Sequence, residues 1–112
     1  MYIMVAGPYS APTEKERREN LERINRVAAE IAKKGHIPVV GVNAALPVVL
    51  AGDFEDDYAE LMRISMALAD RSDAILILGK SKGTDMEKSV FERKGLKVYT
   101  DIDEIPQNYG PN

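Results

Sequence analysis

The apolar residues of this chain gather in four short runs. They occupy residues 2–7 (YIMVAG), 36–42 (HIPVVGV), 73–79 (DAILILG) and 96–100 (LKVYT). The first and third runs show no alternation of apolar and polar residues, which is typical of strands buried on both faces of a parallel sheet. Pro38 places the second run at a sheet edge or a strand start, because proline cannot donate a ladder hydrogen bond.

Segments with helical spacing separate these runs. One segment starts with T-x-x-E at Thr13 and stops at Gly35, and its apolar residues recur every three or four positions from Leu21 to Ala32. Similar spacing recurs within residues 53–72, which begin with an acidic turn. A third helix is predicted from about 84 to 94. The stretch 43–52 (NAALPVVLAG) allows a short helix or a loop, and we interpret it as a lid-like connection. The tail, 101–112, supplies at most one helical turn, and its last residues are expected to be mobile.

Strands that alternate with helices indicate right-handed crossovers and a parallel sheet covered on both faces. We therefore predict an α/β fold, a three-layer flavodoxin-like domain with a parallel four- or five-stranded sheet. The 112 residues suit one domain spanning 1–112.

Composition narrows the class of partner. Fifteen basic and 18 acidic residues give a net charge of −3, which disfavours binding to nucleic acid. The absence of cysteine excludes disulfides and thiolate metal sites, and we predict no metal site. No apolar run is long enough to span a bilayer, and the first run lacks the features of a signal peptide. We expect a cytoplasmic protein that does not bind membranes.

The loops that leave the first and third strands are the candidate site, because parallel sheets bind ligands at the carboxyl ends of their strands. They read GPYSAPT at 7–13 and GKSKGTDME at 79–87. Glycine permits close backbone approach, and the helix starts that follow favour an anion such as a phosphate or a carboxylate. Alternatively, Gly7 and Gly79 only terminate strands.

Glu87 has two interpretations. Thr84-Asp85-Met86-Glu87 fits the capping box, in which both side chains bind free amides at a helix start. A carboxylate at this point would also face a ligand, and the helix N-terminus would keep it ionised. The two roles are compatible if the cap also orients the carboxylate.

Other polar residues have simpler interpretations. His36, the only histidine, follows a helix stop and is expected to cap or pack. Tyr9 and Ser10 either contact a ligand or cap the following helix. Arg17 belongs to a solvated helix face but lies close enough to the helix start to reach a phosphate.

Three motifs in order carry a resemblance to a known family. They are AGPYS at residues 6–10, the SD that opens the third strand at 72–73, and S-x-G-x-x-x-E at 81–87. With these motifs the chain resembles the nucleoside 2-deoxyribosyltransferase-like superfamily from Tyr2 to about Pro106, and in particular a branch described only as a domain of unknown function.

This resemblance implies cleavage or transfer at the N-glycosidic bond of a nucleoside or nucleoside 5′-monophosphate. It implies Glu87 as the nucleophile that attacks the anomeric carbon, and Ser81 and Gly83 as contacts to the sugar or the 5′-phosphate. Gly7, Pro8, Tyr9 and Ser10 would form the facing wall. Neither a cofactor nor a metal is implied, and a homodimer or larger homo-oligomer is expected.

Two departures from the family's pattern bear on activity. Where members carry an acid–base aspartate, this chain has Ser65, which cannot act as an acid near neutral pH. Met4 replaces a tyrosine that many members carry. Asp57 lies one turn before Leu61 on the stripe that contains Ser65, so it is the candidate that points inward and can substitute as the acid, more readily than Asp56 or Glu60. The simpler alternative is that Asp57 is an exposed acid at a helix start, where it complements the helix dipole. The alternative function is a catalytically impaired nucleotide-binding module, or a hydrolase of another N-riboside.

Overall fold

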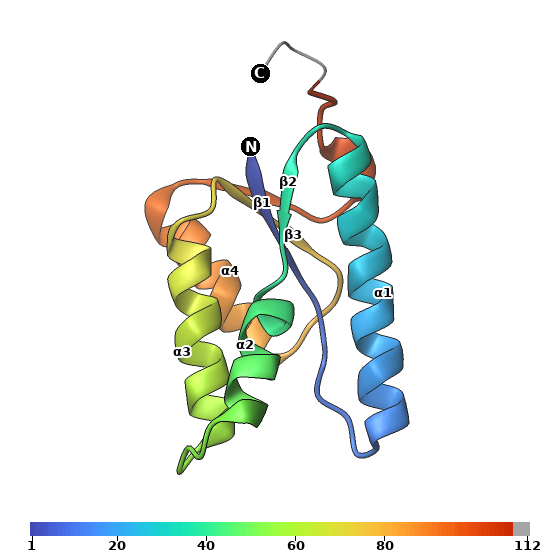
Figure 1. Cartoon of the computed structure of the whole chain (residues 1–112). Coiled ribbons are helices and arrows are strands. Elements are labelled where there is room, and N and C mark those ends of the chain that lie inside the picture. Colours follow the sequence, from blue (N-terminus) through green and yellow to red (C-terminus); the bar gives the residue numbers. More distant parts are fainter. Residues whose placement is uncertain (109–112) are drawn as a thin grey trace.

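A computed structural model describes residues 1–108 (Figure 1), so residues 109–112, for which mobility is predicted, lie outside the described part. Strands and helices alternate along the chain as the sequence predicts, except that two helices lie between the second and third strands. In order they are β1 (Tyr2–Ala6), α1 (Glu14–Lys33), β2 (Ile37–Val39), α2 (Gly41–Ala51), α3 (Asp57–Asp70), β3 (Ala74–Ile77), α4 (Lys82–Lys94), β4 (Lys97–Tyr99) and a single 3₁₀ turn, η1 (Ile102–Glu104).

The sheet has four parallel strands in the order β2-β1-β3-β4. Met4 at the centre of β1 pairs with Val39 of β2 on one side and with Ile75 of β3 on the other. Strand β2 lies at an edge, where Pro38 is tolerated. Because β2 and β3 flank β1 on opposite sides, the chain changes direction between β1 and β3, which is the switch point where such sheets bind ligands.

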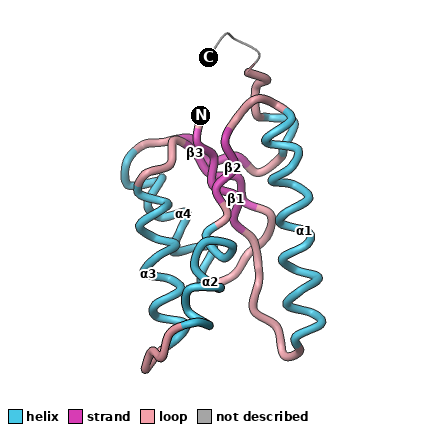
Figure 2. The backbone as a smooth tube through the Cα atoms, in the orientation of Figure 1, coloured by secondary structure: helices cyan, strands magenta, loops and turns pink. Residues whose placement is uncertain are grey.

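Helices cover both faces of the sheet, and the three-layer flavodoxin-like prediction is confirmed. Helix α1 covers one face, while α3 and α4 cover the other (Figures 1 and 2). Alternate residues of β1 point to opposite faces. Ile3 and Val5 pack on the α1 side in a core with Ile24 and Ile31. On the other side the core comprises Met4, Ala6, Ala69, Ile75, Val90 and Phe91.

The segment interpreted as a lid-like connection is helix α2, so the helical alternative is correct. Its Pro47 is exposed and lies beyond the first turn of the helix. The contact between α2 and α3 holds this helix in place (Figure 2). Pro47 disfavours a helix interior, but the packing of α2 against α3 outweighs this local preference.

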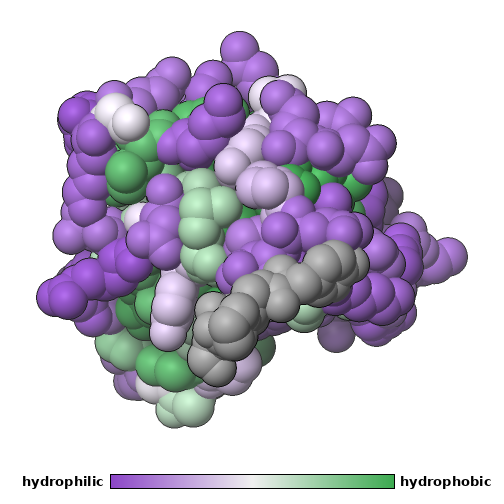
Figure 3. Space-filling model, turned by 90° about the horizontal axis from the view of Figure 1, so that it is seen from above, coloured by the Kyte–Doolittle hydropathy of each residue, from purple (hydrophilic) through white to green (hydrophobic). Residues whose placement is uncertain are grey.

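The amino ends of the strands lie at the opposite end of the molecule from α2. Figure 3 shows mainly hydrophilic residues on this face. His36 lies here, 5 % exposed, with Nε2 2.6 Å from the carbonyl oxygen of Pro106. The prediction that this histidine has a packing role is confirmed.

No helix within residues 1–108 is long and apolar enough to cross a membrane.

Candidate functional site

A cavity of about 320 Å³ opens at the carboxyl ends of β1 and β3. Its volume lies at the lower end of the range of about 300–1,000 Å³ found for small-molecule sites. All nine residues that the sequence assigns to a site line this cavity: Gly7, Pro8, Tyr9, Ser10, Asp57, Ser65, Ser81, Gly83 and Glu87. The fold therefore brings together residues that lie as much as 80 positions apart in the sequence.

The loops after β1 and β3 touch one another. A Cβ atom added to Gly79 would lie 2.9 Å from Cδ of Pro8, so this approach requires glycine. Helix α1 holds the first loop through two hydrogen bonds: Asn20 Nδ2 donates to the carbonyl oxygen of Tyr9 at 3.0 Å, and Arg17 Nη1 donates to that of Ala11 at 2.8 Å. Arg17 therefore fastens the loop and does not line the cavity.

One wall of the cavity is apolar and was not assigned from the sequence. Helix α2 contributes Val42, Leu46, Val49 and Leu50, and α3 contributes Tyr58, Leu61 and Met62. The α2 residues recur at intervals of four, seven and eight positions, which places them on one helical face. That spacing could have revealed the wall, but the sequence was interpreted as a lid-like connection, with a helix or a loop left open.

Helix α4 begins at Lys82, earlier than predicted, and Ser81 is its N-cap. Ser81 Oγ accepts a hydrogen bond from the Thr84 amide at 3.1 Å and donates one to Thr84 Oγ1 at 2.9 Å. The predicted Thr84–Glu87 capping box is wrong. Because the helix starts at residue 82, Glu87 falls in the second turn, beyond the amides that a cap would bind.

Glu87 instead binds a residue of a neighbouring helix. Ser65 of α3, which is 1 % exposed, donates a hydrogen bond from Oγ to Glu87 Oε2. The first residue of α2, Gly41, packs directly on this pair: an added Cβ would overlap Ser65 Oγ and would lie 3.3 Å from Glu87 Oε2. Three helices therefore converge on one carboxylate.

Burial raises the pKa of Glu87 above its usual value, and the hydrogen bond from Ser65 lowers it by a smaller amount. The sequence predicts the opposite direction for this pKa, because it places Glu87 in the first turn of the helix, where the helix dipole favours the anion. In the structure desolvation dominates, since the carboxylate lies between packed helices.

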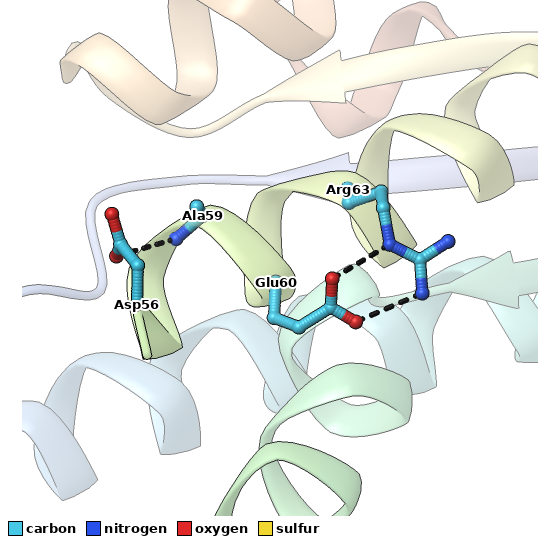
Figure 4. Close-up of polar contacts among 4 residues, drawn as sticks. All are labelled: Asp56, Ala59, Glu60 and Arg63. Carbon is cyan, nitrogen blue, oxygen red and sulfur yellow. Dashed lines mark hydrogen bonds and ion pairs between the residues drawn. The ribbon is translucent and has the colours of Figure 1, made fainter. Parts of the chain in front are cut away.

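The three candidate acids at the start of α3 differ in their surroundings, and Figure 4 shows two of them, Asp56 and Glu60. Asp56 caps α3 by accepting from the Ala59 amide at 3.0 Å. Glu60 binds Arg63 through two hydrogen bonds of 2.7 and 2.8 Å, which lower its pKa. Asp57 lines the cavity, as its position on the stripe predicts, and is exposed to solvent. Of the three, only Asp57 can reach a ligand in the cavity.

Met4 is fully buried in the core and does not line the cavity. The hydroxyl that donates to Glu87 belongs to Ser65 of α3. Within residues 1–108, no group of three or more His, Asp or Glu side chains could hold a metal ion.

The fold and the cavity together define the class: a flavodoxin-like α/β protein with a half-buried carboxylate at the carboxyl ends of its strands. Residues 1–100 match the family described as "Domain of unknown function (DUF4406)", and the chain belongs to this family. No curated protein matches the chain.

Proposed function

We propose that this protein cleaves the N-glycosidic bond of a nucleoside or nucleoside 5′-monophosphate, or transfers its sugar, with Glu87 as the nucleophile. The observation that carries the proposal is the position of the Glu87 carboxylate. It faces the cavity at the switch point of the sheet, and Ser65 orients it through a hydrogen bond. A carboxylate that has no capping role and is held in one position suits attack on an anomeric carbon.

The chemistry follows the retaining pathway of glycosidases. Glu87 forms an ester with the anomeric carbon as the base departs, and water or a second base then resolves this ester. The sugar would lie between the Gly7–Ser10 loop and the start of α4, with the base against the apolar wall. A 5′-phosphate would suit the free amides near Ser81 and Gly83, because helix starts bind anions.

The motifs that resemble the nucleoside 2-deoxyribosyltransferase-like superfamily support this proposal. Glu87, Ser81 and Gly83 belong to one of these motifs, and Gly7 to Ser10 to another, and both motifs line the same cavity. We propose that the family described as DUF4406, to which the chain belongs, is part of this superfamily.

A nucleotide-binding module without catalysis is the second candidate, and Ser65 favours it. A serine in place of the acid–base aspartate removes the residue that would protonate a departing base. Such a module would retain the cavity and bind the ligand without turnover.

The test is incubation with a panel of deoxynucleosides and their 5′-monophosphates, with free base followed by chromatography. We expect base release that is lost in Glu87→Gln. Glu92→Gln is the matched control, since Glu92 lies on the same helix, is exposed and is 3.9 Å from Lys88 Nζ. Nucleotide binding by calorimetry without any base release would reject catalysis and support the module. Equal rates in Glu87→Gln and the wild type would reject this site.

A further inference from the structure

The ionisable side chains that line the cavity determine which leaving groups can depart from a substrate bound there. Two carboxylates, Glu87 and Asp57, and one ammonium group, Lys82, line it. Glu87 is the proposed nucleophile, and the Ser65 hydroxyl already donates to it. Asp57 is a carboxylate exposed to solvent in the first turn of α3.

The other proton donors on the lining belong to weakly acidic groups. They are the hydroxyls of serine, threonine and tyrosine and the ammonium of Lys82. A neutral nucleobase leaves with a negative charge on its ring nitrogen unless an acid protonates it. Such protonation contributes about 10²- to 10⁴-fold to a rate. Because Ser65 stands at the position of the acid–base aspartate, the lining provides a nucleophile without the acid that usually accompanies it.

We propose that the preferred substrates are N-glycosides whose base carries a positive charge, of the pyridinium or N-alkylated purine class. This inference rests on the proposed cleavage at Glu87. A charged base needs no proton, because the electron pair of the broken bond neutralises it.

The step balances without an acid. An oxygen of Glu87 forms a bond to C1′ while the bond from C1′ to the cationic nitrogen breaks, and its electron pair stays on that nitrogen. The base leaves neutral. Water then attacks C1′, the ester bond breaks, the Glu87 carboxylate is restored, and one proton passes to solvent.

The walls of the cavity also suit an aromatic cation. The two carboxylates outnumber the single ammonium group, so the field in the cavity favours positive charge. Tyr9 and Tyr58 place aromatic rings on the lining, and such rings attract cations at their faces. Leu46 and Leu61 complete an apolar surface against which a planar ring can pack.

The test compares nicotinamide riboside with its dihydro form, which has nearly the same shape but a neutral ring, and with adenosine as a second neutral substrate. Each is supplied as the riboside and as the 5′-monophosphate. Rates of base release are divided by the rates in buffer alone. We expect the cationic substrate to show an acceleration at least about 100-fold greater than the neutral ones, the magnitude that a general acid would contribute. Glu87→Gln is expected to abolish this acceleration.

Two other outcomes overturn the inference and can be told apart. Equal acceleration of the cationic and neutral substrates, dependent on Glu87, would reject the preference for charged bases and leave the proposed function intact. If no substrate is accelerated, or if Glu87→Gln retains the full acceleration, both proposals fail at this site.

Discussion

At the scale of single residues, the pair of Ser65 and Glu87 is the centre of the candidate site. The two residues are 22 positions apart and belong to different helices. Their hydrogen bond favours the ionised form of Glu87, while the surrounding helices favour the protonated form. Ser65 therefore orients the carboxylate of Glu87.

The raised pKa of Glu87 predicts a pH-dependent stability. The folded protein holds the proton more tightly than the unfolded chain, so this contribution to stability is present at low pH. It is lost as the pH rises from about the ordinary value of 4.5 through the folded pKa. Relative to Glu87→Gln, the wild type should lose about 1.4 kcal/mol of unfolding free energy for each pH unit between the two pKa values.

Urea denaturation of both proteins across this pH range measures the difference. Glu92→Gln serves as the control, because Glu92 is exposed and its removal should leave the pH profile close to that of the wild type. A wild type that gains stability relative to Glu87→Gln as the pH rises would show that Glu87 is held as an anion, contrary to this prediction.

At the scale of elements, the start of α2 is fitted closely to α3 and α4. Gly41→Ala would place a Cβ atom over Ser65 Oγ. We expect a loss of about 1–3 kcal/mol in unfolding free energy, as for other overpacked cores. Gly83→Ala is the matched comparison, since its Cβ would meet nothing closer than Met62 Sδ at 3.4 Å. That change should leave the stability unchanged or raise it by up to about 1 kcal/mol.

Thermal and chemical denaturation of the two alanine variants would measure both effects. If Gly41→Ala is as stable as Gly83→Ala, the start of α2 is free to move away from the Ser65–Glu87 pair, and the close packing described above is incorrect.

The cap of α4 gives a second prediction at this scale. Ser81→Ala removes the acceptor for the Thr84 amide and the donor to Thr84 Oγ1. We expect a loss of about 0.5–2 kcal/mol in unfolding free energy, measured by urea denaturation. Thr13→Ala, which removes the corresponding cap of α1, is the comparison. No loss in Ser81→Ala would mean that α4 starts elsewhere, for example at the predicted Thr84.

At the scale of the whole molecule, the two ends of the strands have separate roles. The carboxyl ends hold the cavity, while the amino ends hold the segment that follows β4. This segment is tied to the turn after α1: the Asn108 amide donates to the Lys34 carbonyl at 2.7 Å, and Lys34 Nζ donates to the Ile105 carbonyl at 3.1 Å. His36 completes the attachment through Pro106.

This separation predicts that His36→Ala affects stability and not the site. Removal of the buried imidazole leaves the carbonyl oxygen of Pro106 without its hydrogen-bond partner. We therefore expect a loss of about 1–3 kcal/mol in unfolding free energy. Ligand binding and base release per folded molecule should stay unchanged, since His36 does not line the cavity. Altered affinity in a folded His36→Ala protein would show that the two ends are coupled.

The sequence by itself determined the class of fold and the strand ends at which the cavity lies. Four apolar runs and the helical segments between them set the order of elements, because hydrophobic periodicity is a local property. The rule that parallel sheets bind ligands at strand carboxyl ends then located the loops at Gly7 and Gly79. The assembly state stays a prediction.

Only the tertiary structure decided how Glu87 is held. Ser81, not Thr84, caps α4, because the start of a helix depends on which hydroxyl reaches the free amides. The partner of Glu87 is Ser65, and the direction of its pKa follows from burial between helices that lie far apart in the sequence. The helical nature of α2 and its apolar wall also depend on contact with α3. Desolvation and packing arise between distant segments, so local patterns could not reveal them.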